Sequence, residues 1–297
     1  MVKKIAIHTR PFEAEHVPYI HEILGEIRKR GIPVLVSETF NEQCRKWELN
    51  LSLEVFHQAS EISDADLMLS VGGDGTFLES VTMVQPHAVP ILGINSGRLG
   101  FLATTALHQI RNHLNDFFSG YYSIEARTLL QLHANVSLFD DAPIALNEFA
   151  ILKRDTSSMI VVHTYIDGEF LNSYWADGLI VATPTGSTGY SLSAGGPVVV
   201  PDSGNFVIAP VSPHNLNVRP MIVPDTSTIA FEIEGRSRNF LAVLDARSQK
   251  VDANVQLAVN RAPFKAHYVR FNNESFLKTL RQKLNWGMDI RNYPKDY

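Results

Sequence analysis

The chain has 297 residues, of which 45% are hydrophobic and 19% are charged, and its formal net charge is −5. This length suits one large domain or two, and the composition is that of a globular protein. An acidic chain without a long basic run excludes a large nucleic-acid surface. Cys44 is the only cysteine, which excludes an internal disulfide and a cysteine-based zinc site. No apolar run approaches the ~18 residues that span a bilayer, so a cytoplasmic protein that binds no membrane is expected.

The first third of the chain alternates between strand and helix patterns. Lys4–His8 and Pro33–Val36 are short apolar runs typical of buried strands, and the apolar residues within Tyr19–Arg30 follow helical spacing. A polar segment precedes the next predicted strand, Asp66–Val71, and a fourth strand follows at Pro90–Ile94. A strand, helix and strand within so few residues begin a doubly wound α/β sheet.

A glycine-rich turn ends the Asp66–Val71 strand. Three glycines within Gly72–Gly75 leave the backbone bare around one carboxylate, Asp74. A helix is predicted directly afterwards, so backbone N–H groups and the positive end of a helix dipole meet at this turn. Such a turn suits a bulky anion, because open α/β sheets bind ligands at the carboxyl ends of their strands. The alternative is a strand–turn–helix connection whose glycines serve only the backbone.

From about Tyr122 the pattern becomes rich in strands, and clear helical periodicity is scarce. We therefore predict an N-terminal α/β nucleotide-binding domain over 1–121 and a β-rich domain over 122–270. The tail 271–297 contains a helical stripe of Phe276, Leu277, Leu280 and Leu284, and it is expected to pack back on the first domain.

A second glycine-rich stretch, Asp177–Pro197, is the most unusual part of the sequence. A short strand is followed by six Ser or Thr residues and four glycines within about fifteen positions. Hydroxyls and bare amides at this density suit a polyhydroxylated or phosphorylated ligand, whereas the alternative is a flexible surface loop. The stretch has no Lys between its glycines and is not a Walker A loop, and no G-x-G-x-x-G follows the first strand.

Two further segments carry candidate site residues. Asn147 and Glu148 place an amide and a carboxylate inside a strand-like run, and such local conflicts cluster at functional sites. An exposed strand edge would explain the same pair. Ser212–Pro220 places His214 and Arg219 between prolines, where a structural histidine is the simpler interpretation.

Taken together, these motifs resemble those of the NAD kinases. The resemblance rests on four segments in this order: Gly72–Thr76, Asn147-Glu148, Asp177-Gly178 with Thr183–Tyr190, and Ser212–Leu216. It covers nearly the whole chain, from about Ile5 to the region of Trp286. It implies transfer of the γ-phosphate of ATP, or in some members of polyphosphate, to the 2′-hydroxyl of the adenosine ribose of NAD. It also implies an α/β first domain, a β-rich second domain and a tail that returns to the first.

The resemblance implies a role for each matching residue. Asp74 would be catalytic and would accept or orient the proton of the 2′-hydroxyl, while Gly75 would contact NAD through its backbone. Asn147 and Glu148 would hydrogen-bond the ribose or adenine parts of NAD, and Asp177 would bind the nicotinamide side. The remaining residues, expected to line the dinucleotide pocket, are Thr185, Thr188, Gly189, Tyr190, Ser191, Leu192 and Ser193.

The donor side departs from the family pattern. Some members carry basic residues where this chain has Glu79 and Trp175, and many carry Asp-Gly-Gln where it has Asp245-Ala246-Arg247. Phosphate binding would then rely on amides, on Arg98 or on a divalent metal ion, with Arg247 as a further candidate. No residue is assigned as a metal ligand, and Mg²⁺ is expected to arrive bound with ATP. The resemblance also implies a homodimer or homotetramer.

Three other functions fit parts of the pattern. Lipid kinases share the Gly-Gly-Asp-Gly-Thr turn, but they need a membrane-facing surface that this acidic chain does not suggest. A non-catalytic NAD sensor could keep the pocket without turnover. A hydride-transferring dehydrogenase lacks its usual glycine fingerprint here.

Overall fold

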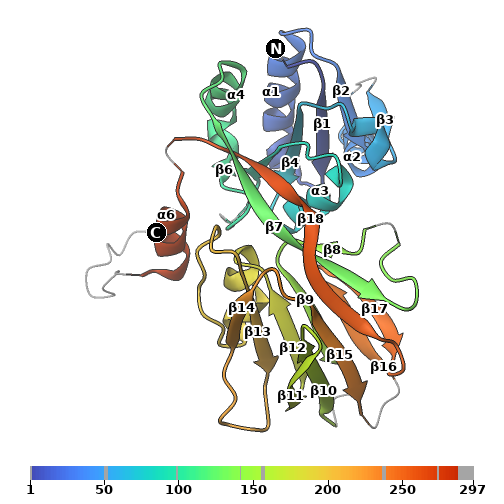
Figure 1. Ribbon diagram of the computed structural model, residues 1–297. Coiled ribbons are helices and arrows are strands. Elements are labelled where there is room, and N and C mark those ends of the chain that lie inside the picture. The colour runs from blue at the N-terminus through green and yellow to red at the C-terminus, as the bar shows by residue number, and fades with distance from the viewer. Residues whose placement is uncertain are drawn as a thin grey trace. The chain divides into compact units, whose positions relative to one another are not determined.

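The computed structural model describes residues 2–49, 53–97, 100–140, 142–154, 158–235, 239–272 and 274–286. The chain divides into two compact units, Met1–Glu125 with His267–Tyr297 and Ala126–Ala266. Two long strands, β7 (Ser123–Ala134) and β18 (Leu257–Arg270), carry the chain between the units (Figure 1). Among the described helices, none is long and apolar enough to cross a membrane.

The N-terminal unit is built on a parallel sheet with the strand order β3-β2-β1-β4-β5. The last strand of the chain extends this sheet, because Tyr268 of β18 pairs with Ile91. A short strand, β6, pairs with β5. The bounds are β1 (Ile5–Thr9), β2 (Val34–Ser37), β3 (Glu54–Phe56), β4 (Leu67–Gly72), β5 (Ile91–Asn95) and β6 (Thr105–Ala106).

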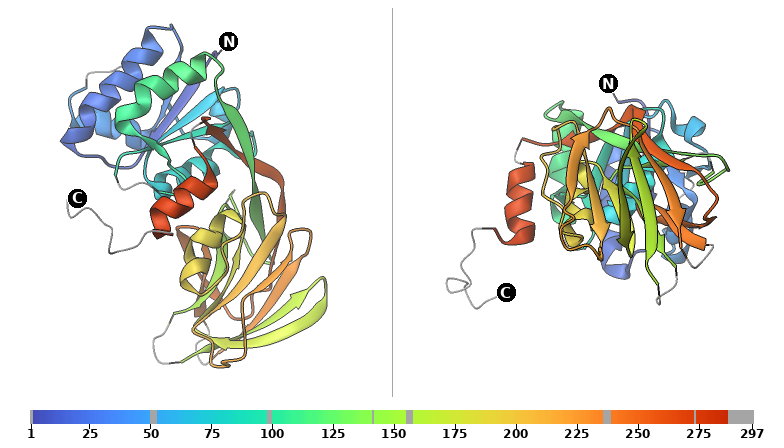
Figure 2. Two further views of the ribbon diagram at one scale, coloured as in Figure 1. Left: turned by 90° about the vertical axis from the view of Figure 1, so that its left-hand side faces the viewer. Right: turned by 60° about the horizontal axis from the view of Figure 1, so that its bottom comes forward.

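Helices α1 to α4 pack on this sheet, and α1 and α4 lie side by side in the left view of Figure 2. The apolar residues of α1, α2 and α4 share one buried core with alternate sheet residues such as Ile5, Ile7 and Leu69. Helix α3 covers the other face, because its Phe77 lies against Gly93 of β5. The bounds are α1 (Val17–Arg28), α2 (Glu38–Lys46), α3 (Asp74–Val84) and α4 (Ile110–Phe118).

The C-terminal unit contains a six-stranded antiparallel sheet with the order β14-β13-β12-β9-β16-β17. A second group of strands pairs in the order β11-β10-β15-β18, and β7 pairs with both β18 and β8. Phe149 and Phe231, one from each sheet, place their ring centroids 5.7 Å apart within one apolar core. The bounds are β8 (Ile144–Ala145), β9 (Glu148–Lys153), β10 (Ile160–Ile166), β11 (Glu169–Ala176), β12 (Gly178–Ala182), β13 (Asn205–Val211), β14 (Met221–Pro224), β15 (Ile229–Glu234), β16 (Asn239–Leu244) and β17 (Arg247–Asp252).

These units confirm the predicted fold class, including the return of the chain's end to the first unit. Two local expectations were incomplete. The polar segment after β2 contains helix α2, whose N-cap Ser37 accepts a hydrogen bond from the Phe40 N–H. The tail forms α6 (Phe276–Leu284), in which Leu280 is buried but Leu277 faces solvent, so the expected apolar stripe is only partly covered.

Candidate active site

The turn after β4 places a carboxylate at the start of helix α3. Gly73 is the N-cap of α3, and Asp74 is its first residue. A Cβ on Gly72 would overlap the Thr76 hydroxyl, so only glycine lets the strand enter the helix this tightly. Asp74 therefore lies at the positive end of an eleven-residue helix, where a negative charge is stabilised.

The Asp74 carboxylate accepts three backbone hydrogen bonds from the segment that follows β5. The Phe101 N–H donates to Oδ2 at 2.9 Å, and the Leu102 and Ala103 N–H groups donate to Oδ1 at 3.0 and 3.1 Å. Gly100 approaches so closely that a Cβ there would overlap Asp74 Oδ1. The carboxylate is thus fixed in place by main-chain donors and is half-exposed at the surface of its unit.

In the C-terminal unit, Asn147 and Glu148 lie where β8 gives way to β9. The carboxylate of Asp245 holds this break: Oδ2 accepts the Leu146 N–H at 2.8 Å, and Oδ1 accepts the N–H groups of Asn147 and Glu148 at 2.8 and 3.1 Å. Asp245 has a positive φ of 53° in the tight turn between β16 and β17. The local conflict noted in the sequence is therefore resolved by a half-buried carboxylate from a distant turn.

Glu148 is a buried carboxyl group, 8% exposed. Burial, together with the nearby charge of Asp245, raises its pKa to about 8, although a hydrogen bond from the Tyr190 backbone opposes this shift. Glu148 Oε2 has no hydrogen-bond partner among the described residues. Near neutral pH the side chain can therefore act as a proton donor to a ligand.

The second glycine-rich stretch is an ordered turn. Thr185–Thr188 forms a 3₁₀ turn that leads into α5 (Tyr190–Ser193). Several of its hydroxyls are satisfied internally: Thr183 Oγ1 donates to the Leu146 carbonyl, and Ser187 Oγ donates to the Pro184 carbonyl at 2.7 Å. This internal bonding argues against the flexible-loop interpretation.

Glycines bring this turn against the Asn147-Glu148 pair. A Cβ on Gly186 would overlap the Asn147 carbonyl, and a Cβ on Gly189 would lie 3.0 Å from Glu148 Oε2. Thr185 and Ser191 are buried, and Thr188, Gly189 and Leu192 are half-buried, whereas Tyr190 and Ser193 are exposed. Gly186 and Gly189 thus place this turn directly against the start of β9.

Asp177 is separated from that cluster. It precedes β12, whose Gly178 pairs with Leu152, while Ala182 at the other end of the strand pairs with Glu148. At about 3.3 Å per residue, Asp177 lies more than ~13 Å along the strand from the Glu148 position. Asp177 Oδ1 forms an ion pair with Lys153 Nζ at 2.6 Å.

The residues that depart from the family pattern have distinct environments. The Arg247 guanidinium donates to the carbonyls of Ala142 and Ile144, so it braces the segment before Asn147. Trp175 is 57% exposed on β11. Glu79 pairs with His8 and Arg10 in the N-terminal unit. Arg98, the other candidate for phosphate binding, lies outside the described residues.

Sequence reasoning missed the supporting roles of Asp245 and Lys153. Both residues act through contacts with segments far away in the sequence, and spacing along the chain does not predict such contacts. The sequence did indicate a turn at Asp245-Ala246-Arg247, where two charged residues interrupt two strand-like segments, but it did not indicate what Asp245 binds.

Two sequence models of known families match the chain. The family described as "ATP-NAD kinase N-terminal domain" matches residues 5–122, and the family described as "ATP-NAD kinase C-terminal domain" matches residues 146–271. The NAD kinase of Cytophaga hutchinsonii is 52% identical over 289 residues, covering 97% of this chain and 99% of that protein. The NAD kinase of Flavobacterium psychrophilum is 42% identical, covering 97% of this chain and 100% of that protein.

Solved structures resemble the whole chain. An NAD kinase from Archaeoglobus fulgidus in complex with ATP has a TM-score of 0.73 and 29% identity, covering 95% of this chain and 98% of that one. Yeast NADH kinase complexed with NADH has a TM-score of 0.87 and covers 99% of this chain and 90% of that one. Its 24% identity makes it a likeness of fold.

Proposed function

Because the chain belongs to the NAD kinase family and is therefore an enzyme that phosphorylates NAD, we propose how its own residues serve that reaction. ATP is the phosphoryl donor, and the 2′-hydroxyl of the adenosine ribose of NAD is the acceptor. Asp74 is assigned as the catalytic carboxylate, and the residues around Glu148 are assigned to the dinucleotide pocket. The alternatives of a lipid kinase and a non-catalytic sensor gain no support from the matches.

The observation that carries this assignment is the Asp74 carboxylate held by three main-chain N–H groups at the start of α3. A carboxylate fixed in this way is pre-oriented, so it can accept a hydrogen bond from a hydroxyl without first being ordered. Phosphoryl transfer proceeds largely by positioning and charge stabilisation, with little covalent work for the protein. Asp74 thus orients the 2′-hydroxyl and accepts its proton as the oxygen attacks, and the Gly75 backbone contacts the dinucleotide.

The cluster around Glu148 is proposed to recognise the sugar and base of NAD. Asn147 offers an amide, and a protonated Glu148 offers a donor to a ribose or adenine acceptor. Tyr190 presents an exposed ring suited to contact with a flat base. Asp177 is retained as a candidate for the nicotinamide side, acting from the other end of β12. The wall between these groups is assigned to Thr185, Thr188, Gly189, Ser191, Leu192 and Ser193.

A divalent ion, proposed to be Mg²⁺, fits this chain as a companion of ATP. Among the described residues, no group of three or more His, Cys, Asp or Glu side chains could hold a metal ion. Mg²⁺ is commonly bound through one or two carboxylates and the substrate phosphates, and the half-exposed Asp74 is the carboxylate available near the glycine turn. When bound, the ion would neutralise charge on the phosphates.

We further propose that the enzyme acts in the cytoplasm as a homodimer or homotetramer. Both statements rest on the family to which the chain belongs. Light scattering of the purified protein would measure the assembly, and a monomer at working concentration would contradict the second statement.

The test of the proposed chemistry is an assay of NADP formation from NAD and ATP. Wild-type protein is compared with Asp74→Asn and with the control Asp66→Asn, whose carboxylate also accepts backbone N–H groups but at the opposite end of β4. Loss of a general base costs about 10²–10⁴-fold in rate, so Asp74→Asn should fall by that factor while Asp66→Asn stays near wild type. Wild-type turnover by a folded Asp74→Asn protein would remove Asp74 from the mechanism. Parallel assays with NADH in place of NAD, and with inorganic polyphosphate in place of ATP, show which acceptors and donors the enzyme uses.

A further inference from the structure

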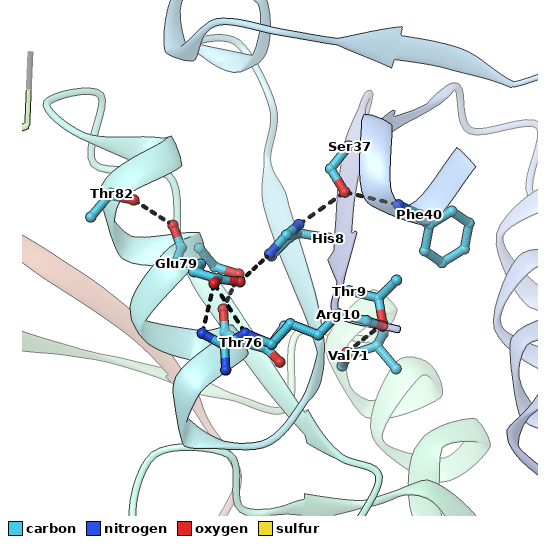
Figure 3. A network of polar contacts seen from close by, with 10 residues as sticks. His8, Thr9, Arg10, Ser37, Phe40, Val71, Thr76, Glu79 and Thr82 are labelled. Atoms are coloured by element: carbon cyan, nitrogen blue, oxygen red, sulfur yellow. Dashed lines mark hydrogen bonds and ion pairs between the residues drawn. The ribbon is translucent and has the colours of Figure 1, made fainter. Parts of the chain in front are cut away.

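The first strand ends beside the glycine turn. Thr9, the last residue of β1, pairs with Val71 of β4, and its hydroxyl donates to the Val71 carbonyl at 2.8 Å. Both strands therefore present their carboxyl ends at one edge of the sheet, where ligands of open α/β folds bind. Arg10 is the next residue along the chain, so its side chain begins at this edge (Figure 3).

The Arg10 guanidinium is held by a carboxylate on helix α3. Nε and Nη2 of Arg10 donate to Glu79 Oε1 at 3.0 and 2.6 Å. The other oxygen of Glu79 lies 3.1 Å from Nε2 of the buried His8, whose Nδ1 lies 2.9 Å from Ser37 Oγ. Figure 3 shows these side chains as one continuous chain of contacts, reaching from the N-cap of α2 to the guanidinium.

The charge on Glu79 is stable across the working pH range. Burial by itself would raise the pKa of Glu79, but hydrogen bonds from His8 and Arg10 outweigh it and lower the pKa to about 2. The same pairing raises the pKa of Arg10. Glu79 therefore stays ionised, and it fixes the guanidinium in one orientation.

One donor nitrogen of Arg10 remains available. Nη1 has no hydrogen-bond acceptor among the residues that the structure describes, and the side chain is 47% exposed. A Cβ on Gly75 would lie 2.7 Å from Nη1, so the guanidinium lies directly against the bare first turn of α3. A fixed cation with a free N–H group beside exposed backbone amides is an arrangement that binds phosphate oxygens.

We propose that Arg10 binds the phosphate chain of the phosphoryl donor at the glycine turn, and that Glu79 and His8 are positioning residues that hold its guanidinium there. This proposal rests on the proposed function and adds a cation to its donor side. The recognised chemistry is a linear chain of phosphates, which a nucleoside triphosphate and inorganic polyphosphate share. Arg10 thereby supplies, from the residue that follows β1, a positive charge close to the helix position that Glu79 occupies.

A purely structural role is the competing explanation, because the Arg10–Glu79 pair also joins β1 to α3. The two roles differ in what they affect. Loss of a purely structural pair would lower the stability of the protein and weaken the binding of ATP and of NAD alike. Loss of a donor-binding residue would weaken the binding of ATP alone. Arg111, whose Nε pairs with Glu22 Oε1 at 2.6 Å, is a matched arginine–glutamate pair on helices of the same unit.

The experiment compares Arg10→Gln, Arg10→Lys and the control Arg111→Gln. KM for Mg-ATP, KM for NAD, kcat and the melting temperature are measured for each protein, and ATP binding without NAD is measured by calorimetry. Hydrogen bonds to charged groups contribute about 1.5–3 kcal/mol, so Arg10→Gln should weaken ATP binding by about tenfold or more. KM for NAD should stay within twofold, and Arg10→Lys should recover part of the loss. With inorganic polyphosphate in place of ATP, the same ordering of variants is expected.

Two results would overturn the proposal. One is unchanged ATP binding by Arg10→Gln, and the other is an equal rise of both KM values together with a lowered melting temperature. A loss of binding seen with ATP but not with inorganic polyphosphate would also contradict the proposal, because Arg10 would then contact a part of the nucleotide other than its phosphate chain. Absence of NADP formation by the wild type would refute the proposed function instead, and the calorimetric measurement would still decide the role of Arg10.

Discussion

Asp245 binds the Glu148 backbone through two hydrogen bonds, one accepted by its side chain and one donated by its own N–H. Asp245 Oδ1 accepts the Glu148 N–H at 3.1 Å, and the Asp245 N–H donates to the Glu148 carbonyl at 3.0 Å. The buried Glu148 and the half-buried Asp245 are thereby held close, and desolvation raises the pKa of both carboxyl groups. The backbone shape of the proposed NAD pocket therefore depends on the protonation state of these two carboxyl groups.

The first prediction concerns the pH dependence of stability. The pKa of Glu148 is about 8 in the folded chain, against an ordinary 4.5, so between these values the folded protein holds a proton that the unfolded chain has released. The free energy of unfolding should therefore fall as pH rises from about 5 to 8, by up to ~1.4 kcal/mol per pH unit. Glu148→Gln removes this dependence, so its melting temperature should rise relative to wild type with increasing pH. The exposed Glu169→Gln is the control, and an equal, pH-independent offset for both variants would contradict the shift.

The second prediction concerns Asp245→Asn. The amide keeps one acceptor oxygen but places an N–H donor where backbone N–H groups point, so the break before β9 should lose its fixed shape. Hydrogen bonds to charged groups contribute about 1.5–3 kcal/mol, and we expect KM for NAD to rise at least about tenfold with KM for ATP little changed. Asp252→Asn is the control, because that exposed carboxylate accepts a hydrogen bond from the Asn254 N–H and, within the described part of the chain, from no other residue. A lower melting temperature with an unchanged KM for NAD would limit Asp245 to a structural role.

The third prediction tests how tightly Asp74 is confined. A methyl group at Gly100 would overlap Asp74 Oδ1, so Gly100→Ala must displace the carboxylate or the amides that hold it. A misplacement of about 1 Å in a catalytic group can cost about 10²-fold, and kcat of Gly100→Ala should fall by that order. Gly97 lies in the same connection, and a methyl group there would meet nothing within 4 Å, so Gly97→Ala should keep wild-type kcat. Equal kcat values for the two variants would show that the position of Asp74 is not critical.

The sequence predicted the parts of the site that arise from local patterns. A buried strand followed by Gly72-Gly73-Asp74 identifies a turn and its carboxylate because strand, glycines and helix are consecutive. Asn147 and Glu148 were identifiable because two polar residues interrupt an apolar run. Each of these signals lies within about ten residues, the range over which periodicity and turn chemistry are informative.

The remaining features depend on contacts that only the folded chain creates. Asp245 lies 97 positions from Glu148, and no spacing rule connects them. Helix α2 escaped notice because it buries the polar Asn41 and Gln43 beside its few apolar residues, which hides the usual amphipathic pattern. Gln43 is buried because its side-chain oxygen accepts the Phe12 N–H. Tertiary hydrogen bonds thus replaced hydrophobicity as the reason for burial.

The last strand also has a consequence for how the enzyme is made. Tyr268 packs against Phe77 of α3 with ring centroids 4.6 Å apart, and Phe271 stacks on His113 of α4 at 4.3 Å. Domains usually fold in order as they emerge from the ribosome. Here the first unit must wait for Tyr268 and Phe271, because the rings that complete its interior are translated only after the whole second unit, Ala126–Ala266. A nascent chain would therefore stay incapable of turnover until β18 has been synthesised.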